Sequence, residues 1–470
     1  MNNYYSYNLF SNEMFNIPSH ATELIIHCGY HGPMHHCRSM TITCPSHITK
    51  VKYNACEICN AHIKVILSST VRALHLDKSN NFALDELSNI TSISYGGDYG
   101  RTHPTPTIPQ NIEHLKFDPF SGNMSIILPQ HLKSVSFGWY YNQMTILPPY
   151  TTSVEFGHDY NTPTSFPDSI EHIEFGTLYN QTTILPKNLK SVKFGKAYDQ
   201  PTIFPEDMEC LKFEWDSRYH QTTILPPHLK YLMFGPMFND IVNLPNNLES
   251  VHFGYHYNQM TILPPHIKNV SFGHMYNQIT ILPPHIEYLY FRANFNQQLI
   301  LPASIIELNI VQSDFNHVLD IEHCHSLTTL NLTKTLFNQH LIFPQHIRRI
   351  MFGNGYNQPT TFPASVREIY FGSDYNQLTI FPENLMYLHI GEHYNQPTIF
   401  PSSLGGLSIS VLSDHLKQDL GQLFSNYNLT YVSYYPRDEQ YMLPLVKHIN
   451  NNSHNIIVKN KTLLGIICAS

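Results

Sequence analysis

Charge is what this sequence has least of. Asp, Glu, Lys and Arg make up 13% of its 470 residues, about half of the usual share of about 25%. The formal net charge of -8 is spread along the chain, without a basic stripe or an acidic tail. Because proteins bind nucleic acids largely by neutralising phosphates with Lys and Arg, this composition argues against a nucleic-acid partner.

Long apolar runs are missing as well. No stretch of the sequence reaches the roughly 20 apolar residues that a membrane-spanning helix needs. Residues Met1–Tyr5 lack the basic segment and the apolar run of a signal peptide. Eight cysteines without an export signal indicate free thiols in a reducing compartment. We therefore expect a cytoplasmic protein that has no membrane partner.

What the sequence does contain is repetition. A proline recurs every 19 residues or slightly more, with Cys324 in its place once, and four looser copies precede the regular ones at Pro18, Pro45, Ser68 and Leu87. Such a register indicates a solenoid of short stacked units. The regular anchors are residues 109, 129, 148, 167, 186, 205, 226, 245, 264, 283, 302, 324, 344, 363, 382 and 401.

Each unit carries the pattern of one strand. Apolar residues stand three, six and eight positions after the anchor, as in Leu189, Val192 and Phe194, and the last two alternate with polar residues. A glycine such as Gly195 usually follows and suits a turn with positive φ. Nineteen residues leave room only for an extended return segment. The sequence therefore predicts a mainly β, single parallel β-solenoid of about twenty turns of 19–22 residues.

Equivalent residues of successive turns should form columns. Phenylalanines at position eight and tyrosines at position twelve predict an aromatic core. The side chains of the asparagines at position thirteen are expected to form hydrogen bonds with backbone groups of the turns. With strand spacing of about 4.8 Å on both flanks, we expect a rather straight stack roughly 90–100 Å long. At position four, opposite charges alternate and should set the register. These are Glu171, Lys190, Glu209, Lys230, Glu249, Lys268 and Glu287.

The outward face of the sheet, at positions five and seven, varies from turn to turn while the core positions recur. This contrast favours a scaffold with an individual protein-binding surface, although a merely solvated face explains it equally well. Tyr, Met and Arg are enriched at the centres of interfaces. On that ground we select as candidate protein-binding residues Tyr231, Met233, Tyr288, Tyr290, Arg349, Met351, Tyr387 and His389.

The repeating unit, [Tyr/Phe]-Asn-Gln-x-Thr-Ile-[Leu/Phe]-Pro-x-x-Leu-x-x-Leu-x-Phe-Gly, resembles the FNIP repeat, a variant of the leucine-rich repeat found in amoebae and in giant viruses that infect them. The resemblance implies a leucine-rich-repeat-like solenoid that acts in protein–protein interaction, in the host cytoplasm if the protein is viral. Some relatives carry an F-box. We find none before Phe15, which argues against an adaptor role.

The two ends depart from the regular repeat. We expect an N-terminal cap with degenerate repeats over residues 1–108, regular repeats over 109–410, and a small α/β C-terminal cap over 411–470. In the cap, the pattern predicts a strand at 430–434 between two helices and a further strand at 456–458. Cysteines 28, 37, 56 and 59 lie among histidines, so a zinc site was weighed. A second CxxC motif is missing, and we predict no metal and no cofactor.

Two other functions stay open as alternatives. A parallel β-helix enzyme acting on polysaccharide would gather acidic residues on one face, but no two adjacent turns place three carboxylates there. No phosphate loop, nucleophile elbow or HExxH motif occurs either, so we predict no catalytic residues and no enzyme. A structural protein associated with viral particles is the third candidate.

Overall fold

The computed structural model describes residues 4–8, 17–27, 40–54, 63–77, 88–96, 105–410 and 431–434. They form two compact units, the first comprising residues 1–229 and 233–235 and the second residues 230–232 and 236–470. Each unit is described by itself. The predicted boundaries at residues 108 and 410 stay predictions.

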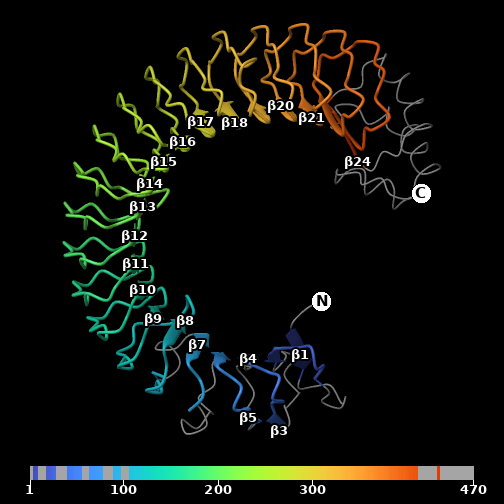
Figure 1. The fold of residues 1–470 in the computed structure, drawn as a ribbon. Coiled ribbons are helices and arrows are strands. Elements are labelled where there is room, and N and C mark those ends of the chain that lie inside the picture. Colours follow the sequence, from blue (N-terminus) through green and yellow to red (C-terminus); the bar gives the residue numbers. More distant parts are fainter. Residues whose placement is uncertain are drawn as a thin grey trace. The chain divides into compact units, whose positions relative to one another are not determined.

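The predicted parallel β-solenoid is confirmed. Each of the twenty anchors is followed by one short strand, and within each unit consecutive strands pair in parallel with the predicted register, as in Val192 with Leu211 and Val270 with Leu289 (Figure 1). The described residues contain no helix, and therefore none long and apolar enough to cross a membrane.

The strands of the first unit are β1 (Tyr4–Asn8), β2 (Glu23–His27), β3 (Met40–Thr43), β4 (Lys50–Asn54), β5 (Ile63–Ile66), β6 (Ala73–Asp77), β7 (Ser92–Gly96), β8 (His114–Phe117), β9 (Ser134–Ser136), β10 (Ser153–Glu155), β11 (His172–Glu174), β12 (Ser191–Phe194) and β13 (Cys210–Phe213). Strand β14 (Tyr231–Met233) has residues in both units. The second unit holds β15 (Ser250–His252), β16 (Asn269–Ser271), β17 (Tyr288–Arg292), β18 (Glu307–Val311), β19 (Thr329–Asn331), β20 (Arg349–Met351), β21 (Glu368–Tyr370), β22 (Tyr387–Ile390), β23 (Gly406–Ile409) and β24 (Tyr431–Tyr434).

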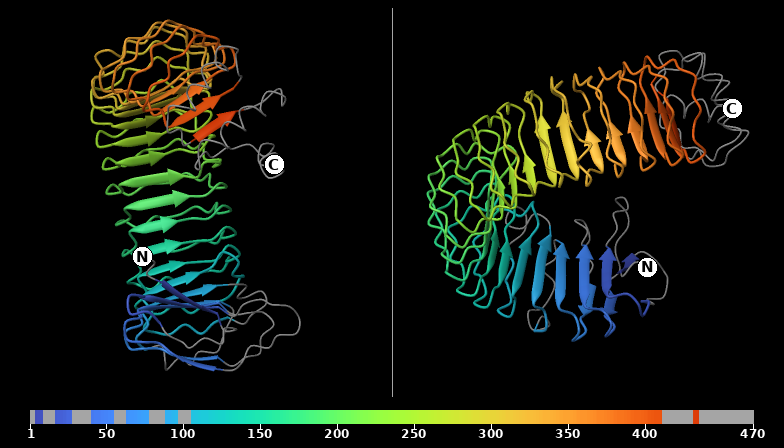
Figure 2. Two further views of the ribbon diagram at one scale, coloured as in Figure 1. Left: turned by 90° about the vertical axis from the view of Figure 1, so that its right-hand side faces the viewer. Right: turned by 45° about the horizontal axis from the view of Figure 1, so that its top comes forward.

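The return side of each turn is extended, as predicted. In the first unit two return segments form strands, β3 and β5, which pair in parallel (Figure 2). Strand β24 extends the sheet beside β23 and confirms the strand expected at 430–434. The helices and the further strand expected in the C-terminal cap lie outside the described residues.

Glycine follows many of the strands for a reason other than the predicted positive φ. The φ angle of Gly157 is not positive, but a Cβ atom there would lie 1.9 Å from the carbonyl oxygen of Gly138 in the turn below. Where glycines of adjacent turns meet, as here, the turns therefore stack too closely for a side chain at this position. Where three successive turns have no glycine, the residue one position later adopts positive φ instead; these residues are Ala293, Gln312 and Lys334.

The aromatic columns are buried, which confirms the predicted core. Rings of adjacent phenylalanines stack at 5.5 Å between Phe137 and Phe156, whereas adjacent tyrosines lie 6.1 Å apart between Tyr141 and Tyr160. The distance between adjacent turns thus widens from about 4.8 Å at the strands toward the return side. Within each unit the stack consequently curves, with the strands on its inner side (Figure 1). The prediction of a straight stack was wrong, because the tyrosine rings of adjacent turns lie farther apart than the strands do.

The hydroxyl of each buried column tyrosine has a threonine partner four residues later. The Thr280 hydroxyl donates to the Gln278 carbonyl at 3.0 Å, so Tyr276 donates to Thr280 at 2.7 Å. Where the column holds phenylalanine, the residue four positions later is aliphatic and buried. The tyrosine pairs are 141/145, 160/164, 179/183, 198/202, 219/223, 257/261, 276/280, 356/360, 375/379 and 394/398, and the phenylalanine pairs are 238/242, 295/299, 315/319 and 337/341.

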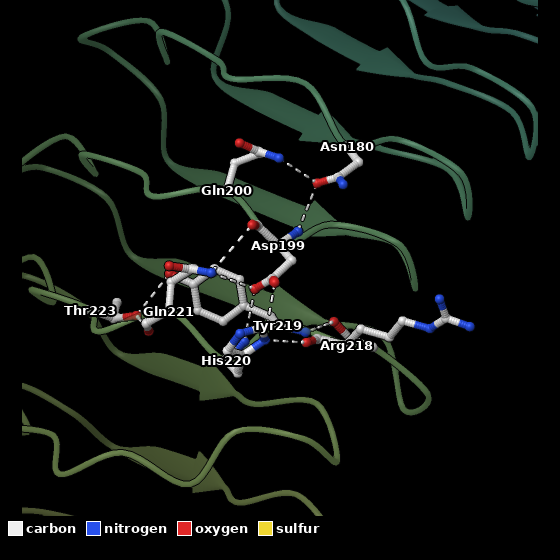
Figure 3. Close-up of polar contacts among 9 residues, drawn as sticks. Asn180, Asp199, Gln200, Arg218, Tyr219, His220, Gln221 and Thr223 are labelled. Carbon is white, nitrogen blue, oxygen red and sulfur yellow. Dashed lines mark hydrogen bonds and ion pairs between the residues drawn. The ribbon is translucent and has the colours of Figure 1, made fainter.

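The asparagine column connects adjacent turns, as predicted. The Asn180 Oδ1 atom accepts the backbone N–H of Asp199 at 3.0 Å and the Nε2 of Gln200 at 3.0 Å (Figure 3). Asp199 replaces the asparagine in the next turn, and its Oδ1 accepts the backbone N–H of His220 at 3.1 Å. A side-chain oxygen at this position therefore performs between return segments the task that backbone carbonyls perform in the sheet.

Candidate functional site

All eight candidate residues lie on the outward side of the sheet. They occupy β14, β17, β20 and β22, where they alternate with buried residues such as Leu289 and Ile350. Arg349 is exposed and the other seven are half-buried. The structure does not bring all eight together. Met233 belongs to the first unit, and Tyr231, on the same strand, packs its ring 5.7 Å from that of His252.

Four of the candidates meet on β20 and β22 through a strand that the sequence reasoning passed over. Arg349 binds Glu368 of β21 with two hydrogen bonds, 2.7 Å from Nε and 2.9 Å from Nη2. Tyr370, beside Met351, donates to Glu368 at 3.3 Å. The Tyr370 ring lies 4.9 Å from that of Tyr387 and 6.4 Å from that of His389.

These contacts define a continuous cluster, which we call the β20–β23 cluster: Arg349, Met351, Glu368, Tyr370, Tyr387, His389 and Ser408. The last member accepts or donates a hydrogen bond of 2.9 Å at the His389 Nδ1 atom. Glu368 and Tyr370 occupy the same outward positions as the selected residues, in the turn between them. A complete list of each column would have found both.

The charges of the β20–β23 cluster are fixed at neutral pH. The hydrogen bonds from Arg349 to Glu368 raise the pKa of the guanidinium, and burial raises the pKa of Tyr370 to about 12, with the Glu368 charge adding to the shift. Burial lowers the pKa of His389 below its usual 6.5. The surface thus presents a paired cation, the neutral phenol of Tyr370 and a neutral imidazole.

A second group of candidates lies on β17 and its neighbour β18. Burial and the Glu307 carboxylate together raise the pKa of Tyr290 to about 12. Glu307 accepts from Asn309 at 2.8 Å, and Asn309 in turn accepts from Asn331 at 2.9 Å. The Glu307 charge also contributes to the raised pKa of Arg349, so the two groups are coupled electrostatically across β19.

The sheet face of the first unit differs in chemistry. Its outward residues are mostly Ser, His, Lys and Glu, as in the 2.8 Å hydrogen bond between His114 and Ser134. Lys193 lies 2.6 Å from Glu174 and 3.4 Å from Glu214; burial alone would lower its pKa, but these two carboxylates raise it more. Along β8–β13 the outward residues are polar apart from Cys210, and none of them is Tyr, Phe or Trp.

The residues of the position-four column lie beside one another in successive turns, joined by backbone hydrogen bonds, while the prediction that their opposite charges set the register stays a prediction. The Lys190 N–H donates to the Glu171 carbonyl at 2.8 Å, and Lys268 pairs with Glu249 in the same way at 2.9 Å. An ion pair of 2.9 Å joins Lys133 to Glu113 in an earlier part of this column. The hydrogen bond from Lys133 lowers the pKa of Glu113.

Among the residues that the structure describes, no group of three or more His, Cys, Asp or Glu side chains could hold a metal ion. The cysteines weighed for zinc, at positions 28, 37, 56 and 59, lie outside those residues. Two described cysteines, Cys44 and Cys324, are buried, and burial raises the pKa of each thiol to about 11. Both therefore act as small apolar residues of the core.

A family model for the FNIP repeat matches residues 141–178 and 276–313. The chain carries FNIP repeats. Among solved structures, the FNIP-repeat chain is similar to CroV588, a circular leucine-rich-repeat protein of a giant virus, with a TM-score of 0.62 and 22% identity over 95% of this chain and 77% of that one. This similarity identifies the fold as leucine-rich-repeat-like.

Two bacterial proteins are more distant. YopM of Yersinia enterocolitica has a TM-score of 0.49 and 13% identity, covering 88% of each chain. A leucine-rich-repeat protein of Leptospira interrogans has a TM-score of 0.34 and 14% identity, covering 79% of this chain and 91% of its own. No curated protein sequence matches the FNIP-repeat chain.

Proposed function

We propose that the FNIP-repeat chain is a non-enzymatic scaffold that binds a protein through the sheet face of its second unit. The β20–β23 cluster is the observation that carries this proposal. Half-buried tyrosines, a methionine and a bidentate Arg–Glu pair stand side by side there. Residues of these types dominate the binding energy of protein interfaces because they bury large surfaces at little entropic cost.

The existing contacts within the cluster support the same interpretation. Arg349 and Tyr370 are already held by Glu368, so neither side chain needs to be ordered when a partner binds. The exposed part of Arg349 leaves a polar group beside an aromatic surface. We expect the partner to place an apolar side chain against the Tyr370 and Tyr387 rings, within the cytoplasm, which is the host cytoplasm if the protein is viral.

The test is affinity purification from the native cell with four versions of the full chain: wild type, Arg349→Glu, Tyr387→Ala and Lys116→Glu. The last variant places the same charge change on the sheet face of the first unit and serves as the control. We expect one protein to co-purify with wild type and Lys116→Glu and to be lost with both cluster variants, while all four melt at similar temperatures. Retention of the partner by both cluster variants would remove the proposal.

A further inference from the structure

An apolar stripe lies on the return side of the second unit, opposite the sheet. Its members stand two and four residues before the anchor prolines of consecutive turns, and we call it the return stripe. Each side chain is between 70% and 89% exposed. The members are Ile241, Met260, Ile262, Ile279, Ile281 and Ile300.

The return stripe follows from the extended conformation of these segments. Thr261 and Thr280 point inward, where they are buried and bind tyrosine hydroxyls. Because side chains alternate along an extended chain, the residues on either side of each threonine must point outward. Ile262 and Ile281 are therefore 89% and 87% exposed although their neighbours are core residues.

The surroundings of the return stripe are almost uncharged. The outer parts of its four turns, residues 236–247, 255–266, 274–285 and 293–304, contain one formally charged side chain, Asp240. At the next turn the same two positions hold the exposed acidic residues Asp320 and Glu322, which end the stripe. At this end the return stripe therefore has the polar border that is typical of a protein interface.

Its size is in the range of a functional surface. Each member offers roughly 80 Å² of apolar surface, and the six together about 500 Å². Soluble monomers rarely expose contiguous apolar patches larger than a few hundred Å². A partner that covers the return stripe is therefore expected.

We propose that this partner is a second copy of the same chain, docked stripe to stripe across a twofold axis. An uncharged apolar surface is complementary to itself, since nothing in it repels an identical surface. Two return stripes together bury about 1,000 Å², the lower limit for a specific interface before the flanking His266 and His285 side chains are counted. A lipid surface fits less well, because no Lys or Arg lies in these segments to meet anionic headgroups.

The turn spacing suits such a contact. The rings of Tyr257 and Tyr276 lie 6.3 Å apart, and those of Tyr276 and Phe295 lie 6.5 Å apart. We therefore expect a similar spacing between the isoleucines of successive turns, and the return stripe of a second copy has the same spacing. This interface is independent of the sheet-face function proposed above, because it lies on the opposite side of each turn.

Sedimentation velocity of the full chain over a range of concentrations tests the proposal. We expect wild type to form a concentration-dependent dimer and the double variant Ile262→Asp/Ile281→Asp to be monomeric. Ile380→Asp is the control, since Ile380 occupies the same turn position outside the return stripe and is equally exposed at 89%; it should dimerise like wild type. Melting temperatures of the three proteins should agree at concentrations too low for the dimer to form, because no group buried in the monomer is changed.

Three outcomes would overturn the dimer. One is a wild-type protein that stays monomeric at its highest soluble concentration. Another is a dimer that survives the double substitution, or is lost equally with Ile380→Asp. The third is a monomer that binds neutral phosphatidylcholine vesicles and loses that binding with the double substitution, which would assign the return stripe to a membrane.

Discussion

The sheet side and the return side of each turn are joined to the adjacent turns by different contacts. On the sheet side, backbone groups bond directly between strands, and the turns approach so closely that Gly157 can carry no side chain. On the return side, the tyrosine rings of adjacent turns lie about 6 Å apart. Side-chain oxygens of Asn bridge that wider gap, as Asn161 Oδ1 does for the backbone N–H of Asn180 at 2.9 Å.

The difference explains both surfaces proposed to bind. Because the backbone alone fixes the sheet, its outward side chains are free to vary, and in the second unit they form the β20–β23 cluster. On the return side, by contrast, the inward positions are occupied by the repeating Tyr–Thr pairs. Because side chains alternate along an extended chain, the residues on either side of each threonine point outward, and many of them are isoleucine.

The largest expected effect concerns the close approach on the sheet side. Gly157→Ala would put a methyl group 1.9 Å from the Gly138 carbonyl oxygen, which is far shorter than the contact distance of non-bonded carbon and oxygen atoms. We expect a loss of about 3 kcal/mol or more in the free energy of unfolding, because backbone must move. Gly355→Ala is the control, since its new Cβ would find its nearest neighbour, the Leu336 oxygen, at 3.9 Å. Equal urea midpoints for the two variants would show that the turns can separate freely.

Much of this architecture follows from sequence periodicity alone. A 19-residue register predicts one strand in each turn, the parallel pairing and the aromatic and asparagine columns, because equivalent residues must stack. The curvature was not predictable in this way, since it depends on the difference between ring spacing and strand spacing. The role of Gly157 was missed for the same reason, because only the distance to Gly138 reveals it.

The candidate site was predicted in part. The alternation of each strand correctly places Arg349, Tyr387 and His389 on one face, and the structure joins them through Glu368 and Tyr370. A selection by residue type alone omitted Glu368, although Glu368 occupies the same position in its turn as Arg349 does. The return stripe was missed because Ile262 lies in a run of apolar residues, and only the inward direction of Thr261 shows which of them are exposed.

The next effect tests the Tyr–Thr pairs of the return side by a double-mutant cycle at positions 276 and 280. Thr280→Leu alone removes the partner of the buried Tyr276 hydroxyl and should cost about 1–3 kcal/mol. The double variant Tyr276→Phe/Thr280→Leu reproduces the pair found at Phe295 and Leu299, so it should recover most of that loss. Chemical denaturation of the four proteins measures the coupling; additive losses would contradict the paired role.

A smaller effect is expected in the asparagine column. The Asn258 Oδ1 atom accepts the backbone N–H of Asn277 at 2.9 Å and the Nε2 of Gln278 at 3.1 Å. Asn258→Ala removes both hydrogen bonds at a partly buried site and should destabilise by about 1–2 kcal/mol. Asn258→Asp keeps the acceptor, as Asp199 does naturally, and should cost less than about 0.5 kcal/mol. If the aspartate variant were as unstable as the alanine variant, the amide nitrogen and not the oxygen would be the essential group.

The smallest effect on stability is expected at the proposed binding face itself. Arg349 and Glu368 are paired at 2.7 Å, but their side chains keep 47% and 29% of their exposure, so the pair is screened by water. Arg349→Met should therefore change the free energy of unfolding by less than about 1 kcal/mol. Thermal and urea denaturation would check this value, with Lys193→Met, which removes a paired cation from the first unit, as the comparison. If Arg349→Met lowered the free energy of unfolding by several kcal/mol, the β20–β23 cluster would serve mainly to stabilise the sheet. Such a result would argue against the cluster as the surface that binds a partner.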